Sequence, residues 1–240
     1  GTAWRFACDE GARLGGFNMA PNPLTYLSAG MIASYMNEIT ALAEQRQIEL
    51  RDLELVLDNH YFREGDFRKG SMSSDALPPE INVICEADCD DQTLNTLVYE
   101  AIAASPLNGL ARGSHPSLFT LVHNGVELTP ENVLPLGSPP FANPGDNFPN
   151  LKPAANSPAV SDLIQLMPKE GPVVDALIKS RTPAPELDEG KLLLHMHSSC
   201  RLRPDGVKEI FKEQFANDVP SWRYLSDEGK GFGGEGRAPD

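Results

Sequence analysis

Two histidines separated by one residue, His195 and His197, have the type and spacing that most directly suggest chemistry in this sequence. On a β-strand, residues two apart project from the same face, so both imidazoles could bind one divalent metal ion. Such a site needs further ligands, and Cys200 or an acidic residue such as Glu38 could complete it. The competing interpretation is a solvated strand face that carries two histidines.

The hydrophobic pattern places this pair on the first strand of a hairpin. Residues 191 to 202 read as one strand, Pro204-Asp205-Gly206 as a turn, and residues 207 to 215 as the returning strand. The strand would hold both histidines rigidly.

The segment after this hairpin repeats the beginning of the chain without a gap. The shared residues are Trp4-Arg5-Phe6, Asp9-Glu10-Gly11, Gly15-Gly16 and Ala20-Pro21, which recur as Trp222-Arg223-Tyr224, Asp227-Glu228-Gly229, Gly233-Gly234 and Ala238-Pro239. We expect the same strand-and-turn element at both positions. The repeat predicts a duplicated protein whose second copy is cut short, processed or completed by another polypeptide.

The remaining pattern predicts an α+β fold with an antiparallel sheet. A strand over 3 to 9 precedes a helix that Asn22-Pro23 opens and that runs to about Gln47. Alternation predicts strands from 50 to 62, with a wet face that includes Asp52, Glu54 and Asp58, and from 81 to 86. A helix capped by Asp90 or Asp91 should end at Ser105-Pro106, and Asn124-Gly125 should join a last hairpin over 118 to 128. Prolines make residues 130 to 189 a linker with short helices.

Composition excludes several classes of partner. The net charge of -14 repels nucleic acid and anionic membrane surfaces, and no apolar run approaches the roughly 20 residues that span a bilayer. A soluble, cytoplasmic protein is the resulting expectation. Cys8, Cys85, Cys89 and Cys200 lack paired zinc spacing, so they are interpreted as free thiols.

The order of these elements resembles the osmotically inducible protein C and organic hydroperoxide resistance family, from about Trp4 to Leu128. The stretch from Ala20 to Ser34, with Asn22-Pro23 opening the helix, carries the resemblance most specifically. It implies an OsmC-like fold in which a sheet wraps around central helices. Both reactive cysteines of that family fall on serines here, Ser34 and Ser105, and Leu24 stands where peroxidase members carry a glutamate.

The resemblance also implies where a pocket would lie. Ser34 and Ser105 would line it, and Glu38, one helical turn beyond Ser34, could act as a general base or metal ligand. The alternative for Glu38 is a wet edge. His115, in the loop after Ser105, could serve as an acid or base, although a loop histidine is commonly exposed.

The family builds a dimer in which strands of one copy complete the sheet around helices of another. The chain would then divide into an OsmC-like domain lacking its first strands at 1–129, the linker at 130–189, and the opening strands of a second repeat at 190–240. This division favours a pseudo-dimer or a homo- or hetero-oligomer, with the late hairpin closing the sheet.

Three functions remain open from the sequence. The first is an enzyme subunit that has lost thiol peroxidase chemistry and performs acid-base or metal-assisted hydrolysis or lyase cleavage on a small organic substrate, with a divalent metal as its possible cofactor. The second is a non-catalytic ligand-binding or scaffold subunit. The third is residual peroxidase activity through Cys8 or Cys200.

Overall fold

A computed structural model describes residues 4–11, 14–113, 116, 118–131, 134–138, 143–150, 160–167, 192–214 and 220–239. The fold within these ranges is α+β, with helices packed on an antiparallel sheet, as the sequence predicts. His115 lies outside the described residues, as does most of the second half of the expected linker.

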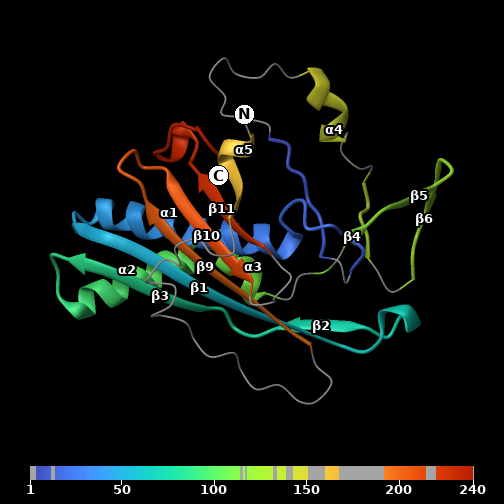
Figure 1. Cartoon of the computed structure of the whole chain (residues 1–240), viewed down its shortest axis with the longest axis horizontal. Coiled ribbons are helices and arrows are strands. Elements are labelled where there is room, and N and C mark those ends of the chain that lie inside the picture. The colour runs from blue at the N-terminus through green and yellow to red at the C-terminus, as the bar shows by residue number, and fades with distance from the viewer. Residues whose placement is uncertain are drawn as a thin grey trace.

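The long helix α1, Pro23–Gln45, forms the centre of the structure and confirms the sequence prediction (Figure 1). Asn22 caps it, since its side-chain oxygen accepts a hydrogen bond of 2.9 Å from the backbone N–H of Thr25. Apolar residues at three-to-four spacing then bury one side of the helix, including Ile32, Met36 and Ile39, which are fully buried.

The strand β1, Leu50–Glu64, is the longest strand of a seven-stranded sheet. It pairs antiparallel with β3, Glu80–Ala87, and with β2, Ser73–Ala76. The β2 strand lies between the two strands that alternation predicts, at residues for which it predicts none. The wet face predicted for β1 is wrong at Asp58, whose side chain is fully buried.

Three late strands extend the sheet from β1: β9, Leu192–Leu202, β10, Lys208–Gln214, and β11, Ser221–Ser226. The sheet order is β2-β1-β9-β10-β11-β8, so the late hairpin joins the early strand directly. Figure 1 shows the orange strands β9 and β10 following the cyan strand β1, with the red strand β11 beyond them. The last strand, β8, Ile164–Met167, pairs antiparallel with β11, so this part of the expected linker belongs to the sheet.

Helices cover the face of the sheet to which α1 is attached. The helix α1 contacts β1, β9 and β10, while α2, Asp91–Ala104, and α3, Pro106–Arg112, pack against α1. Asp90 caps α2, and Ser105 separates α2 from α3 as the sequence predicts. Leu55, Leu57, Cys200 and Ile210 of the sheet form the core with α1.

Shorter elements occupy the rest of the described chain. The Asn124-Gly125 turn, with positive φ at both residues, joins two antiparallel strands as expected. The elements are β4, Leu118–Phe119, β5, Leu121–His123, β6, Val126–Leu128, β7, Leu134–Pro135, α4, Pro144–Asn147, α5, Val160–Leu163, and 3-10 turns at Phe67–Lys69, Phe148–Asn150 and Lys230–Phe232. No helix among the described residues is both long and apolar enough to cross a membrane.

The two copies of the sequence repeat form the same loop. In each copy one aspartate oxygen accepts two backbone N–H groups, eight and ten residues further along. The bonds are Phe17 N to Asp9 Oδ2 at 3.0 Å, Met19 N to Asp9 Oδ2 at 2.9 Å, Glu235 N to Asp227 Oδ2 at 3.3 Å and Arg237 N to Asp227 Oδ2 at 2.9 Å. The repeated sequence therefore forms the same hydrogen-bonded loop in both copies.

Both loops also depend on the second glycine of the Gly-Gly pair. A Cβ atom would lie 1.8 Å from the Glu10 carbonyl oxygen at Gly16 and 2.0 Å from the Glu228 carbonyl oxygen at Gly234. At each glycine the backbone lies so close to the backbone of the preceding glutamate, Glu10 or Glu228, that no side chain fits.

The strand predicted over 3 to 9 is wrong for the described residues 4–11, which form no strand. The equivalent residues of the second copy form β11, which pairs with β10 and β8. A strand requires neighbouring strands to bond its backbone, and only the second copy has them within the described chain.

Candidate functional site: a buried aspartate and histidine cluster

Four polar side chains meet where β1 lies beside β9. In the antiparallel register Asp58 is opposite His197 and His60 is opposite His195. The period of two in both strands turns all four side chains to the same face of the sheet. Two local patterns, one on each strand, therefore build one cluster.

Both histidines contact the same carboxylate oxygen. Nε2 of His195 lies 2.5 Å from Oδ1 of Asp58, and Nδ1 of His197 lies 2.6 Å from that oxygen. The His60 ring stacks on the His195 ring with 4.2 Å between centroids. Asp58 and His197 are fully buried, and His195 keeps 8% of its surface exposed.

Electrostatics keep Asp58 ionised. Burial alone would raise the pKa of its carboxyl group, but the hydrogen bonds from His195 and His197 outweigh burial and lower the pKa to about 2. The His60 pKa is lowered, chiefly because burial disfavours the charged imidazole and also because His195 is close. A buried carboxylate anion beside imidazole nitrogens is the result.

Two atoms of the cluster have no hydrogen-bond partner among the described residues. These are Oδ2 of Asp58 and Nε2 of His60, and both are buried. Leaving a buried ionised oxygen unpaired costs several kcal/mol, so such an atom calls for a water molecule or an ion.

The cluster has the composition of a metal site. One ligand atom each from Asp58, His195 and His197 lies within 4.8 Å of the other two, and all three residues are buried. Two imidazoles and one carboxylate suit Zn²⁺ or Fe²⁺ and leave coordination positions for water or substrate. The pairing of His195 with His197 was predictable, whereas Asp58 and His60 were missed. The signal for them was a second pair of polar residues two positions apart, Asp58 and His60, on a strand that the alternation predicts.

The cluster lies on the face of the sheet opposite to α1. The next residue on β1, Asn59, points the other way and donates a hydrogen bond of 3.2 Å to Oγ of Ser28 on α1. Cys200 also belongs to the core on the α1 face. The third ligand near the histidines is therefore Asp58, and neither Cys200 nor Glu38 of α1 is part of the cluster.

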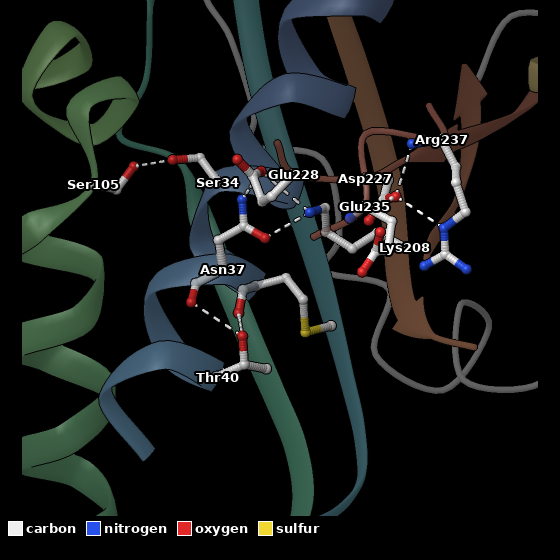
Figure 2. Close-up of polar contacts among 10 residues, drawn as sticks. Ser34, Asn37, Thr40, Ser105, Lys208, Asp227, Glu228, Glu235 and Arg237 are labelled. Atoms are coloured by element: carbon white, nitrogen blue, oxygen red, sulfur yellow. Dashed lines mark hydrogen bonds and ion pairs between the residues drawn. The ribbon is translucent and has the colours of Figure 1, made fainter. Parts of the chain in front are cut away.

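The two serines selected by family resemblance meet at a separate place. Ser34 of α1 and Ser105, between α2 and α3, form a hydrogen bond of 2.8 Å between their hydroxyl oxygens (Figure 2). Ser105 is buried, and its hydroxyl also accepts the backbone N–H of Asn108 at 3.4 Å, which caps α3. Glu38 lies one turn beyond Ser34 on α1 and is half-buried.

A buried lysine links α1 to the second repeat loop (Figure 2). Lys208 of β10 donates to Oδ1 of Asn37 at 2.6 Å and to Oε1 of Glu228 at 3.2 Å, and Asn37 also donates to Glu228. The lysine is 2% exposed, so both of its acceptors are needed to satisfy a desolvated cation. This network fixes the end of the sheet to the central helix.

Comparison with known proteins adds no relative. No protein-family model matches the chain, and no curated protein matches its sequence.

Proposed function

We propose that this chain is an enzyme subunit that binds a divalent transition metal at Asp58, His195 and His197 and uses it for hydrolytic or lyase chemistry on a small organic molecule. The observation that carries the proposal is the convergence of three buried ligand atoms from two strands. A purely structural salt bridge needs only one histidine for Asp58, but two share a single oxygen.

The ligand set fits metal-assisted chemistry. The Asp58 carboxylate would offset one of the two positive charges of such an ion, and one ring nitrogen each of His195 and His197 would supply two further ligands. A metal held by three protein ligands acts as a Lewis acid and makes bound water a better nucleophile near neutral pH. His60 stacks on His195 and holds a buried, unpaired nitrogen at the edge of this ligand set, where it would serve as a proton acceptor.

We also propose a relationship to the osmotically inducible protein C family without its thiol chemistry. The contact between the Ser34 and Ser105 hydroxyls supports it, since the family resemblance assigns these positions to the paired cysteines. Serine cannot replace a thiolate in attack on peroxide. Cys200 is a poor substitute, because burial raises the pKa of its thiol to about 12.

The first experiment measures the metal directly. Chain stripped with a chelator is titrated with Zn²⁺ by calorimetry and with Co²⁺ by visible absorption, which reports the ligand geometry without any substrate. We expect one ion per chain. Asp58→Asn and His197→Gln should each weaken binding by at least tenfold, because the first removes the negative charge of the ligand set and the second removes an imidazole nitrogen.

The matched control is His123→Gln, which changes an exposed histidine of β5 outside the cluster and should leave binding unchanged. Folding of each variant is checked by circular dichroism. A chain that binds neither ion would overturn the metal centre.

The second experiment measures catalysis. The Zn²⁺-loaded and stripped forms are assayed on a panel of activated esters, amides and lactones, and we expect turnover only in the loaded form. Turnover that survives in His195→Gln/His197→Gln would remove these residues from the reaction. Metal binding without turnover of any panel member would favour the non-catalytic subunit instead.

A further inference from the structure

On the face of the sheet that α1 covers, a cavity lies between α1 and β11. Its volume is about 150 Å³. Its lining includes Ala29, Gly30 and Ala33 of α1, whose small side chains leave the space open, and Ile210 of β10 closes another side. The site is distinct from the Asp58 cluster, which faces away from α1.

Both copies of the sequence repeat line this cavity. Phe6 of the first copy and Tyr224 of the second occupy equivalent repeat positions, and both line the space. Each ring also contacts Tyr26 of α1, with centroids 5.6 Å apart for Phe6 and 5.9 Å apart for Tyr224. Three contacting aromatic rings therefore form part of the cavity lining. Phe6 is 43% exposed, so the lining on the side of the first copy reaches the surface.

Two residues of the cavity lining, Tyr224 and Ser226, carry hydroxyl groups. Tyr224 and Ser226 are two residues apart on β11, so both side chains project toward α1. Both residues are at least nine-tenths buried, and neither hydroxyl has a hydrogen-bond partner among the described residues. The first copy carries Phe6 and Cys8 at these positions, so the hydroxyls are a property of the second copy alone.

An unpaired buried hydroxyl is costly, and a ligand oxygen would remove that cost. Burial raises the pKa of the Tyr224 phenol, so the group stays protonated and can donate. No lysine, arginine, aspartate or glutamate lines the cavity within the described residues, so a ligand of either charge would be buried without a counter-ion.

We propose that this cavity is a binding site for a small, neutral, ring-sized molecule whose carbonyl or hydroxyl oxygen pairs with the hydroxyls of Tyr224 and Ser226. A dry cavity of 150 Å³ in another protein holds benzene, so a single six-membered ring is the right size. The proposal does not depend on the metal centre.

The test compares two probes of the same shape. Cyclohexanone carries a carbonyl acceptor, and methylenecyclohexane replaces that oxygen by a methylene group. Binding is measured by ligand-observed NMR titration on the full chain. We expect cyclohexanone to bind more tightly by about five- to tenfold, the effect of one net hydrogen bond.

Tyr224→Phe isolates the hydroxyl and installs the side chain that the first copy already carries. It should abolish the preference for cyclohexanone and leave methylenecyclohexane binding unchanged. Tyr99→Phe is the matched control, because Tyr99 lies on α2 and is 74% exposed. Its affinities should equal those of the unmodified chain.

Ala33→Leu should fill the cavity and prevent binding of both probes, provided that its circular dichroism spectrum remains native. Asp58→Asn should change neither affinity, which separates this site from the metal centre. If neither probe binds, or if Tyr224→Phe retains the preference for the carbonyl, the proposal is overturned.

Discussion

The two repeat copies allow the contribution of one carboxylate to the free energy of unfolding to be compared at Asp9 and at Asp227. Asp227→Ala removes the acceptor of two backbone N–H groups, those of Glu235 and Arg237, and of the Arg237 side chain, whose Nε lies 3.1 Å away. Asp9→Ala removes the equivalent backbone acceptor in the first copy. The two changes are chemically identical, and they differ in surroundings.

The surroundings determine the expected magnitudes. Asp227 is 3% exposed, and its loop is tied to α1 through Glu228 and Lys208. Hydrogen bonds to a charged acceptor contribute about 1.5–3 kcal/mol each, and donors left at the exposed residues 235 and 237 regain water, so we expect a net loss of about 3 kcal/mol. For a chain of this size that loss lowers Tm by roughly 6–12 °C. Asp9 lies in an exposed loop, so its loss should be clearly smaller.

Acid provides a second measurement of the same carboxylate. Burial tends to raise the pKa of Asp227, but hydrogen bonds from Arg237 outweigh burial and the pKa is lowered. Its contribution is therefore complete above the unfolded pKa of about 3.9 and is lost as the pH falls through the lower folded value. Urea unfolding at pH 7 and at decreasing pH should show a smaller acid dependence in Asp227→Ala. Equal destabilisation by Asp9→Ala and Asp227→Ala would refute this account of burial and anchoring.

Three further predictions follow from buried or paired side chains. Burial lowers the pKa of Lys212 to about 7. Between pH 7 and about 10 only the unfolded state binds the proton, so the free energy of unfolding should rise with pH by at most a few kcal/mol. Urea unfolding of Lys212→Met should lack this rise. Cys8 is exposed and Cys200 is buried, so a thiol reagent at pH 8 should label Cys8 in the native protein and Cys200 only after unfolding; rapid native labelling of Cys200 would contradict the core. Because the hydroxyls of Ser34 and Ser105 are 2.8 Å apart, Ser34→Cys/Ser105→Cys should form a disulfide on mild oxidation, which mass spectrometry detects, whereas either single change should not.

Local signals in the sequence were sufficient for most elements. Asn22-Pro23 and the apolar spacing that follows determine where α1 begins, and Asp90 does the same for α2. Alternating residues predict β1, and Asn124-Gly125 predicts the hairpin turn between β5 and β6. Each of these features depends on residues within a few positions of one another.

Features that depend on distant pairing were not predictable in the same way. Asp58 has the alternation of a solvent-facing residue, and its role emerges only when β9 places His195 and His197 beside it. The strand predicted in the first repeat copy is absent from the described residues 4–11 for the same reason. Its sequence matches β11, but among the described residues it has no neighbour equivalent to β10.

The position of β9 between β1 and β10 has a consequence during synthesis. Leu55 pairs with Cys200, so the ribosome makes more than half of the chain after β1 before the neighbouring strand β9 exists. A nascent chain that stops ahead of residue 192 contains α1 and β1 but not β9. In such a chain Asp58 lacks both His195 and His197. Such long-range pairing slows folding and prolongs exposure of apolar strands, so chaperone binding during translation should concentrate on chains of intermediate length.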